Sequence, residues 1–253
     1  MTAVRYGILG PVALWRDNRE VHPAKQRSRI VLARLLLGHG NWVRMETLID
    51  SLYLDRTPAR SARTQVQKAI MELRALGARV EYREGGYRVP TSRLTLDSLE
   101  FMSLVELARK GPANESATLA KRALRLVRGP ILDGMEGGEF RLVRLELQER
   151  HAFALETFCD AEIELGQYSD AIIELSRFLV EQPYREHLVG KLMFALHLAG
   201  RSGEALTAFS DLRDKLAELG ALPAPELRQL NERILRHDPC ITPNFLENLR
   251  LPS

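Results

Sequence analysis

Residues 57–77, TPARSARTQVQKAIMELRALG, gather cationic side chains at spacings that suit contact with a nucleic acid. The stretch has one acid, Glu72. Its cations are Arg60, Arg63, Lys68 and Arg74. If the stretch is helical, each residue advances about 100° around the axis, and the cations share an arc that excludes Glu72. The pattern predicts a basic surface facing phosphates or base edges. A solvent-facing helix that happens to be basic is the alternative.

The same geometry gives this helix a buried side and a recognition side. The predicted apolar stripe contains Ala62, Val66, Ala69, Ile70, Leu73 and Leu76. The arc predicted to read the major groove contains Arg60, Arg63, Thr64, Gln67, Lys68, Met71 and Arg74. Arginine suits guanine, glutamine suits adenine and methionine suits the thymine methyl group. Cations in a first turn oppose the helix dipole at a cost of about 0.3–1 kcal/mol, so Arg60 and Arg63 are poorly placed for stability alone. The helix start is open between Thr57-Pro58 and Ser61.

Elements around this helix complete a recognisable DNA-binding arrangement. Upstream, VRYGILGPVALWRDNREV predicts a small antiparallel sheet, and KQRSRIVLARLLLGHG and VRMETLIDSLYLD predict two helices. Downstream, ARVEYREGGYRVP predicts a β-hairpin with Gly85-Gly86 in the turn. Three helices and a basic hairpin form a winged helix-turn-helix, whose third helix lies in the major groove while the hairpin reaches the backbone or minor groove. The wing residues expected to contact DNA are Arg83, Tyr87 and Arg88.

Charge divides the chain into two parts. Residues 1–95 hold 17 Lys and Arg against 8 Asp and Glu, whereas residues 96–253 hold 19 against 25. A basic segment of domain size favours a polyanionic partner for the first part and another role for the second. The N-terminus lacks a signal-peptide pattern and no stretch is long and apolar enough for a membrane span, which leads us to expect a cytoplasmic protein without a membrane partner. Cys159 and Cys240 are expected to be reduced thiols.

The acidic part carries an internal repeat. Ala161, Gly166 and Ala171 recur 34 residues later as Ala195, Gly200 and Ala205, the period of tetratricopeptide helix pairs. Stacked helix pairs offer concave surfaces to proteins or peptides and are seldom catalytic. We therefore expect a mainly α protein with an N-terminal winged helix-turn-helix, built of a small β-sheet, three helices and a β-hairpin wing, followed by an all-α tetratricopeptide-like domain.

Motifs for catalysis are not convincing in this sequence. Phosphate-loop and dinucleotide-binding patterns are missing, and the histidines and cysteines lack metal-ligand spacing. The tetrapeptide GGEF, at residues 137–140, is similar to the GG[DE]EF signature of cyclic-dinucleotide synthesis, but it lacks one acid and is expected between helices. The sequence therefore predicts no enzyme, no cofactor and no metal site.

The order of these parts resembles the Streptomyces antibiotic regulatory proteins. ILGPVALWRDNREV, KQRSRIVLARLLL, LIDSLY and GYRV match the family's opening strands, first two helices and wing, while LTLDSLEF, RLVRGPILDG and PAPELRQLNERIL match its bacterial transcriptional activation domain. The resemblance covers residues 4–238. Tyr53 and Val127 stand where tryptophan is common in the family, and both keep a large or apolar residue.

The resemblance implies a small transcriptional activator of a secondary-metabolite gene cluster, divided into a DNA-binding domain at 1–93, an activation domain at 94–238 and a tail at 239–253. It implies binding to direct repeats in promoter DNA as a homodimer, and recruitment of RNA polymerase holoenzyme including sigma. By family analogy alone, the polymerase contact falls to the loop at Leu54, Asp55 and Arg56. A tetratricopeptide-type protein scaffold with a basic N-terminal domain is the alternative.

Overall fold

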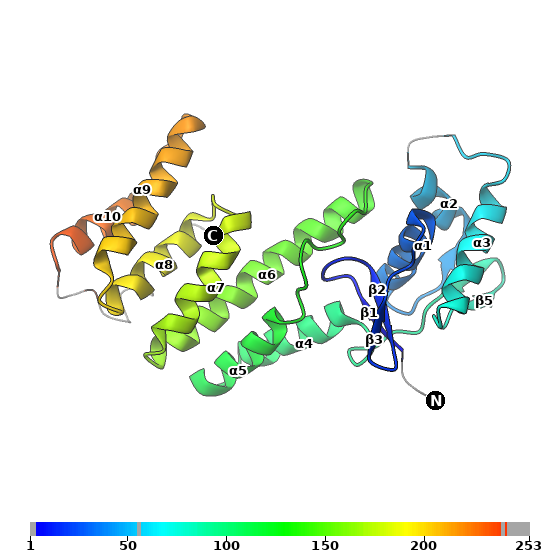
Figure 1. Ribbon diagram of the computed structural model, residues 1–253, viewed down its shortest axis with the longest axis horizontal. Helices are drawn as coiled ribbons and strands as arrows, with labels where there is room; N and C mark the ends of the chain where they lie inside the picture. The colour runs from blue at the N-terminus through cyan, green and yellow to red at the C-terminus, as the bar shows by residue number, and fades with distance from the viewer. Residues whose placement is uncertain (1–3, 55–56, 239–240, 242–253) are drawn as a thin grey trace. The chain divides into compact units, whose positions relative to one another are not determined.

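The computed structural model describes residues 4–54, 57–238 and 241, and it is mainly helical, as predicted (Figure 1). The chain packs as two compact units. Residues up to 106 and 122–152 form the first unit, and residues 107–121 with those from 153 onward form the second. The predicted sheet, three helices and hairpin all lie within the first unit.

The N-terminal sheet is three-stranded and antiparallel, in the order β1 (Arg5–Gly7), β2 (Ala13–Arg16), β3 (Arg19–Val21). Asp17 and Asn18 form its second turn with φ of 50° and 61°, the left-handed conformations that a two-residue hairpin turn requires. Short acidic and amide side chains tolerate such angles, so the polar pair in the sequence located the turn correctly.

Three helices follow, α1 (Gln26–Leu37), α2 (Met45–Tyr53) and α3 (Ala62–Ala75), and Figure 1 shows them grouped together. They bury their apolar faces against one another, with Leu32, Leu48, Val66 and Leu73 fully inaccessible to solvent. Tyr53, one of the two positions where family members often carry tryptophan, is half-buried at the end of α2. The predicted order of helices is confirmed.

The hairpin belongs to a second sheet that the sequence only partly predicts. Its strand order is β4 (Val43–Arg44), β6 (Gly86–Arg88), β5 (Glu81–Arg83), and β4 was not predicted because two residues carry no periodicity. The predicted Gly85-Gly86 turn is wrong by one residue, because Glu84 and Gly85 form it with φ of 44° and 80°. Gly86 instead pairs with Arg44 in the sheet, where an added Cβ would lie 3.1 Å from the Val43 carbonyl oxygen.

The remaining elements are helices. They are α4 (Asp97–Ala108), α5 (Ala113–Leu124), α6 (Gly138–Glu164), α7 (Tyr168–Glu181), α8 (Glu186–Leu198), α9 (Ser202–Glu218) and α10 (Pro225–Leu235). None of the described helices has the combination of length and apolar character that a membrane span needs. The predicted change from mixed to all-helical structure near residue 94 is confirmed.

The predicted repeat appears in equivalent turns of the second unit. Gly166 follows α6 with φ of 72°, and Gly200 follows α8 with φ of 76°. Each glycine N–H donates to the carbonyl three residues earlier, and the next N–H donates to the carbonyl five residues earlier. This is the left-handed helix stop that favours glycine. The four repeated alanines are all buried: Ala161, Ala171, Ala195 and Ala205.

Candidate nucleic-acid interface

Helix α3 presents the predicted basic arc to solvent. Ala62, Val66, Ala69, Ile70 and Leu73 are buried, which confirms most of the apolar stripe, while Leu76 at its end is half-buried. The exposed arc within the helix comprises Arg63, Thr64, Gln67, Lys68, Met71 and Arg74. Met71 is 68% exposed, a high value for a large apolar side chain. An exposed methionine among cations and amides suits contact with a thymine methyl group in a groove.

The structure fixes where α3 starts and corrects the predicted position of Arg60. Ser61 is the N-cap residue, and its hydroxyl accepts a hydrogen bond from the side-chain amide of Gln65 at 3.1 Å. Arg60 therefore lies in the turn before the helix, so its predicted place in the first helical turn is wrong. Its side chain is still exposed beside the arc. Arg63 alone among the arc's cations stands in the first turn, where it opposes the helix dipole.

Among the described residues, acidic side chains offset little of the positive charge of the basic arc. The Glu72 carboxylate lies 3.1 Å from Nζ of Lys25, away from the arc. Desolvation raises the pKa of Glu72, but the hydrogen bond and the charge of Lys25 outweigh it and lower the pKa. Arg63 lies 3.7 Å from Glu46, but the two side chains are 63% and 71% exposed. An ion pair so exposed contributes little and is screened by salt. Phosphates can therefore displace Glu46 from Arg63 at small cost.

Arg74 differs from the other members of the arc. Its guanidinium donates two hydrogen bonds to the Val80 carbonyl oxygen, at 3.0 and 2.8 Å. These bonds join the last turn of α3 to the strand that enters the wing. Although the residue is exposed, its Nε and one terminal nitrogen are engaged by this carbonyl oxygen, so these two nitrogens tie α3 to the strand that enters the wing.

The wing has a different set of accessible groups from the predicted one. Tyr87 is only 7% exposed and packs against Tyr82, with ring centroids 5.1 Å apart, so its predicted DNA contact does not fit its burial. Tyr82 is 60% exposed, and the sequence analysis missed it. Tyr82 and Tyr87 are cross-strand partners on the same face of the hairpin, so alternation along the strands does not distinguish them. Tyr82 is on the edge strand β5, whereas Tyr87 is on β6, which lies between β4 and β5.

Both predicted wing arginines have local partners. Arg88 donates to Glu81 at 2.7 Å and lies 4.5 Å from the ring centre of Trp42, which is 39% exposed and was also missed. Arg83, near the tip, is 3.4 Å from its neighbour Glu84 in a pair that is exposed on both sides. Arg83 is therefore the freer of the two for a phosphate, whereas Arg88 is fixed by stacking and charge.

The connection from α2 to α3 begins at Leu54. This residue is 44% exposed and has φ of 50°, an unfavourable angle for a branched side chain, and its N–H donates to the Asp50 carbonyl oxygen at 2.8 Å. Asp55 and Arg56, the other two residues of the predicted polymerase contact, lie outside the described residues.

A clamp of charged and aromatic groups fixes the N-terminal sheet to the segments that follow the wing. The Asp97 carboxylate accepts hydrogen bonds from the N–H groups of Ile8 and Leu9 at 2.9–3.0 Å. Burial raises the pKa of Asp97, and these bonds and the Arg128 guanidinium oppose the rise. Arg128 also lies 4.6 Å from the ring centre of Trp15. LTLDSLEF and RLVRGPILDG thus meet at one place.

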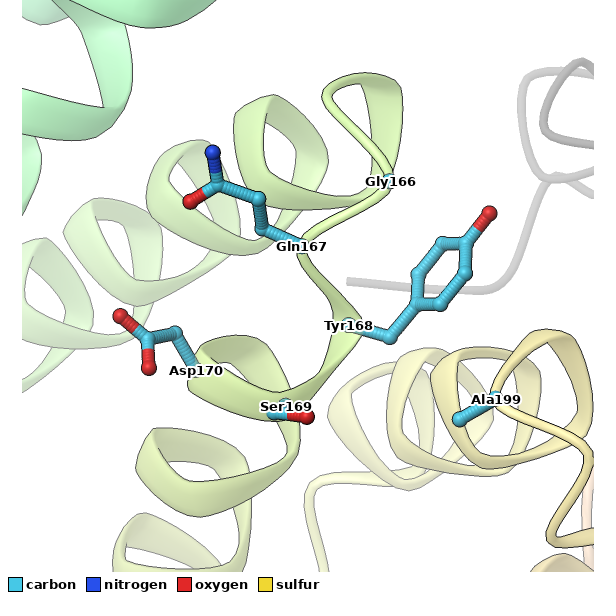
Figure 2. Close-up of a pocket in the computed structure, with 6 residues that line it drawn as sticks. All are labelled: Gly166, Gln167, Tyr168, Ser169, Asp170 and Ala199. Carbon is cyan, nitrogen blue, oxygen red and sulfur yellow. The ribbon is translucent and has the colours of Figure 1, made fainter.

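A hollow of about 390 Å³ lies in the second unit, at the turn between α6 and α7. It is lined by Gly166, Gln167, Tyr168, Ser169, Asp170 and Ala199. Figure 2 shows the Gln167 and Asp170 side chains extending to one side of the turn and Tyr168 to the other. Asp170 pairs with Lys121, and no cluster of metal-ligating side chains occurs among the described residues.

Comparison with known proteins agrees with this arrangement. Residues 96–235 match the family described as the bacterial transcriptional activator domain. The regulatory protein DnrI of Streptomyces peucetius is 31% identical over 262 residues, covering 95% of each chain. The regulatory protein AfsR of Streptomyces coelicolor is 35% identical over 246 residues, but the match spans 25% of its length.

A solved structure, Mycobacterium tuberculosis EmbR in complex with a low affinity phosphopeptide, superposes with a TM-score of 0.80 at 30% identity, covering 97% of this chain and 68% of that one. The match to EmbR includes the N-terminal sheets and helices as well as the helical part, and DnrI matches over nearly its whole length. The chain therefore belongs to the Streptomyces antibiotic regulatory protein family of transcriptional regulators, which carry a bacterial transcriptional activator domain.

Proposed function

We propose that this protein is a sequence-specific DNA-binding activator of a secondary-metabolite gene cluster. The observation that carries the proposal is the exposed basic arc of α3, backed by a buried apolar stripe and flanked by the wing. The proposed base readers are Arg63, Thr64, Gln67 and Met71, while Arg60 ahead of the helix, Lys68 and Arg83 of the wing contact phosphates. Arg74 and Arg88 hold the wing in place.

The proposed assembly follows from the family to which the chain belongs. Two copies bind direct repeats side by side as a homodimer, through the DNA-binding domain at 1–93, and the domain at 94–238 with the tail at 239–253 completes the activator. RNA polymerase holoenzyme, including sigma, is contacted through the connection at Leu54, Asp55 and Arg56. The exposed position of Leu54 supports this contact, since a recruited protein can bury it.

Binding to promoter duplexes tests the DNA-reading proposal. The triple variant Arg60→Ala, Arg63→Ala, Lys68→Ala is compared with Arg177→Ala, Arg213→Ala, Arg236→Ala, which removes three exposed cations of the second unit whose ion-pair partners lie on their own helices. We expect the first triple to lose at least about a hundredfold in affinity, since every 1.4 kcal/mol is tenfold. The second should bind within about twofold of the wild type. Equal binding by both triples overturns the proposal.

A protein scaffold is the rival function, and the exposed side chains of α7 favour it. Ile173 is 47% and Val180 is 82% exposed, and the two are separated by two helical turns. A scaffold would bind DNA without sequence preference. Competition with unrelated duplex at increasing salt discriminates the two, because non-specific binding is electrostatic and is lost first.

A further inference from the structure

The GGEF tetrapeptide, Gly137–Phe140, has no catalytic surroundings, and its contacts give it another role. It lies at the N-terminal end of α6, in the first unit, where Phe140 is completely buried. Its other described contacts go to the helices of the winged helix-turn-helix. The tetrapeptide therefore joins the start of the activation domain to the DNA-binding helices.

Gly137 makes the closest approach. Its φ is 112°, and a Cβ built on it would lie 2.5 Å from Cδ2 of Leu54. The backbone angle disfavours any side chain here, and an added Cβ would push the end of the Leu54 side chain out of its place. Leu54 is thus seated on the bare backbone of Gly137, at the point where the chain leaves α2.

Glu139 fixes the two helices that flank this seat. One carboxylate oxygen accepts a hydrogen bond from the Ser51 hydroxyl of α2 at 2.5 Å, and the other lies 3.0 Å from Nε of Arg34 in α1. Glu139 is in the first turn of α6 and Arg34 in the last turn of α1, so both charges are favoured by their helix dipoles. The Arg34 side chain is 23% exposed and that of Glu139 is 36% exposed, so the pair is partly shielded from screening.

The loop before the tetrapeptide is braced so that this seat keeps its shape. The Arg144 guanidinium donates to the carbonyl oxygens of Ile131, Leu132 and Met135. The Gln26 amide, at the start of α1, donates to the Gly134 carbonyl oxygen at 2.7 Å. Three points of the loop and tetrapeptide, Gly134, Gly137 and Glu139, therefore contact α1 at both of its ends and α2 at its C-terminal end.

We infer that Gly137–Phe140 is a latch that fixes the end of α2 and Leu54 in place, with Glu139 and Gly137 as its positioning residues. The last turn of α2, from Ser51 to Leu54, is the part of the DNA-binding domain that the latch contacts. The α2–α3 connection begins there. This inference rests on the proposed polymerase contact of that connection, and it names the residues through which the activation domain acts on the contact.

Four variants in matched pairs test the latch. Gly137→Ala is compared with Gly138→Ala, where an added Cβ meets nothing within 4 Å, and Glu139→Gln is compared with Glu136→Gln at an exposed site. Hydrogen exchange of the α2 amides is the first readout and does not involve polymerase. We expect exchange at 51–54 to be faster by about threefold to tenfold in Gly137→Ala and Glu139→Gln, the range for losing a tight contact or a shielded ion pair, and unchanged in the controls.

The second readout separates positioning from DNA binding. With promoter DNA saturated by activator, single-round transcription should fall by about threefold or more in the latch variants, while DNA affinity stays within about twofold. Glu139→Gln keeps an oxygen acceptor for Ser51, so it supplies the result if Gly137→Ala fails to fold. Wild-type exchange in both latch variants overturns the latch itself.

A loop variant distinguishes this inference from the proposed function. Leu54, Asp55 and Arg56 are replaced together by glycine and serine. Suppose that this replacement lowers transcription, while the latch variants exchange faster but transcribe like the wild type. In that case the latch does not act on the polymerase contact, and the inference is wrong. If the replacement leaves transcription unchanged, the proposed polymerase contact is wrong, and the latch loses its function with it.

Discussion

Arg128 and Asp97 form an ion pair at 3.3 Å beneath the N-terminal sheet, between two segments that are 31 residues apart. Asp97 is 5% exposed and would be an uncompensated buried charge without its partners. Arg128 also reaches Glu20 of β3 at 2.8 Å. The pair therefore connects β3, the residues after β1 and the first residue of α4.

Removal of Arg128 should destabilise the first unit strongly. Arg128→Ala leaves the buried Asp97 carboxylate without its cation and strips one face of Trp15, so we expect a loss of about 2–4 kcal/mol in the free energy of unfolding. Arg122→Ala is the matched control, because its pair with Glu100 is 64% exposed on the arginine side. That control should lose less than about 1 kcal/mol. Urea denaturation measures both, and equal losses would show that burial does not govern the pair.

Salt dependence should separate phosphate contacts from base contacts on the basic arc. Lys68→Ala should weaken binding to every duplex and reduce the slope of log affinity against log salt by about one, because one fewer counterion is released. Gln67→Ala should relax the preference at one base pair by about 1–3 kcal/mol of discrimination and leave the slope unchanged. Fluorescence anisotropy over a salt series measures the slope. A Lys68→Ala slope equal to that of the wild type would remove this residue from the phosphates.

Arg74 should act on the wing and not on base preference. Arg74→Ala breaks both hydrogen bonds to the Val80 carbonyl, so we expect about 1–2 kcal/mol lower stability and faster hydrogen exchange in β5 and β6. Met71→Ala, one turn earlier and 68% exposed, should leave stability within about 0.5 kcal/mol. A change in preferred base with unaltered wing exchange in Arg74→Ala would return the residue to base reading.

Acid should destabilise the protein partly through His151. Burial lowers the pKa of His151 from 6.5 to about 4. Because the folded-state pKa is the lower one, the contribution to stability is full above pH 6.5 and is lost as pH falls toward 4, by at most about 3 kcal/mol. His151→Gln should therefore show a shallower fall than the wild type over that range, while His39→Gln, at an exposed site, should follow the wild type. Parallel curves for all three proteins would show that His151 is not the group responsible.

The two glycines at the start of the second repeat should respond in opposite ways to alanine. Gly200→Ala places a Cβ at φ of 76° and should cost about 1 kcal/mol. Gly203→Ala lies in the first turn of α9, where nothing is within 4 Å, and should be neutral or stabilising by up to about 1 kcal/mol. Thermal unfolding of the two single variants measures the difference. Equal effects would contradict the role of Gly200 as a helix stop.

Periodic features of the fold were predictable from sequence because they repeat over many residues. The apolar stripe of α3 from Ala62 to Leu73 and the 34-residue spacing of Gly166 and Gly200 each place several residues in agreement, so one exception does not change the prediction. Features that depend on one residue were less predictable. The hairpin turn moved by one position to Glu84, and Tyr87, which was expected to contact DNA, is buried on the central strand of the second sheet.

Contacts between distant segments could not be read from the sequence. Glu139 was part of a rejected motif, and nothing near it indicated that its partners were Arg34 and Ser51. Arg74 matched the basic arc by angle, but its bond to Val80 depends on how the chain turns after Gly77. Helical geometry predicts the face on which a side chain lies, whereas the tertiary fold decides which group it meets.

The first unit is built from two separate segments of the chain, and this restricts how DNA specificity can be exchanged between relatives. The N–H groups of Arg128 and Leu132 donate to the carbonyls of Leu9 and Ile8, and Tyr6 donates to Thr95, so segments on both sides of residues 107–121 complete the N-terminal sheet. A chimaera joined at residue 93 would take the N-terminal sheet from one parent and Asp97 and Arg128, which hold that sheet, from the other parent. Transplanting α3 and the wing alone, residues 57–89, keeps every contact of Asp97, Arg128 and Glu139 within one parent and is the cut that the packing favours.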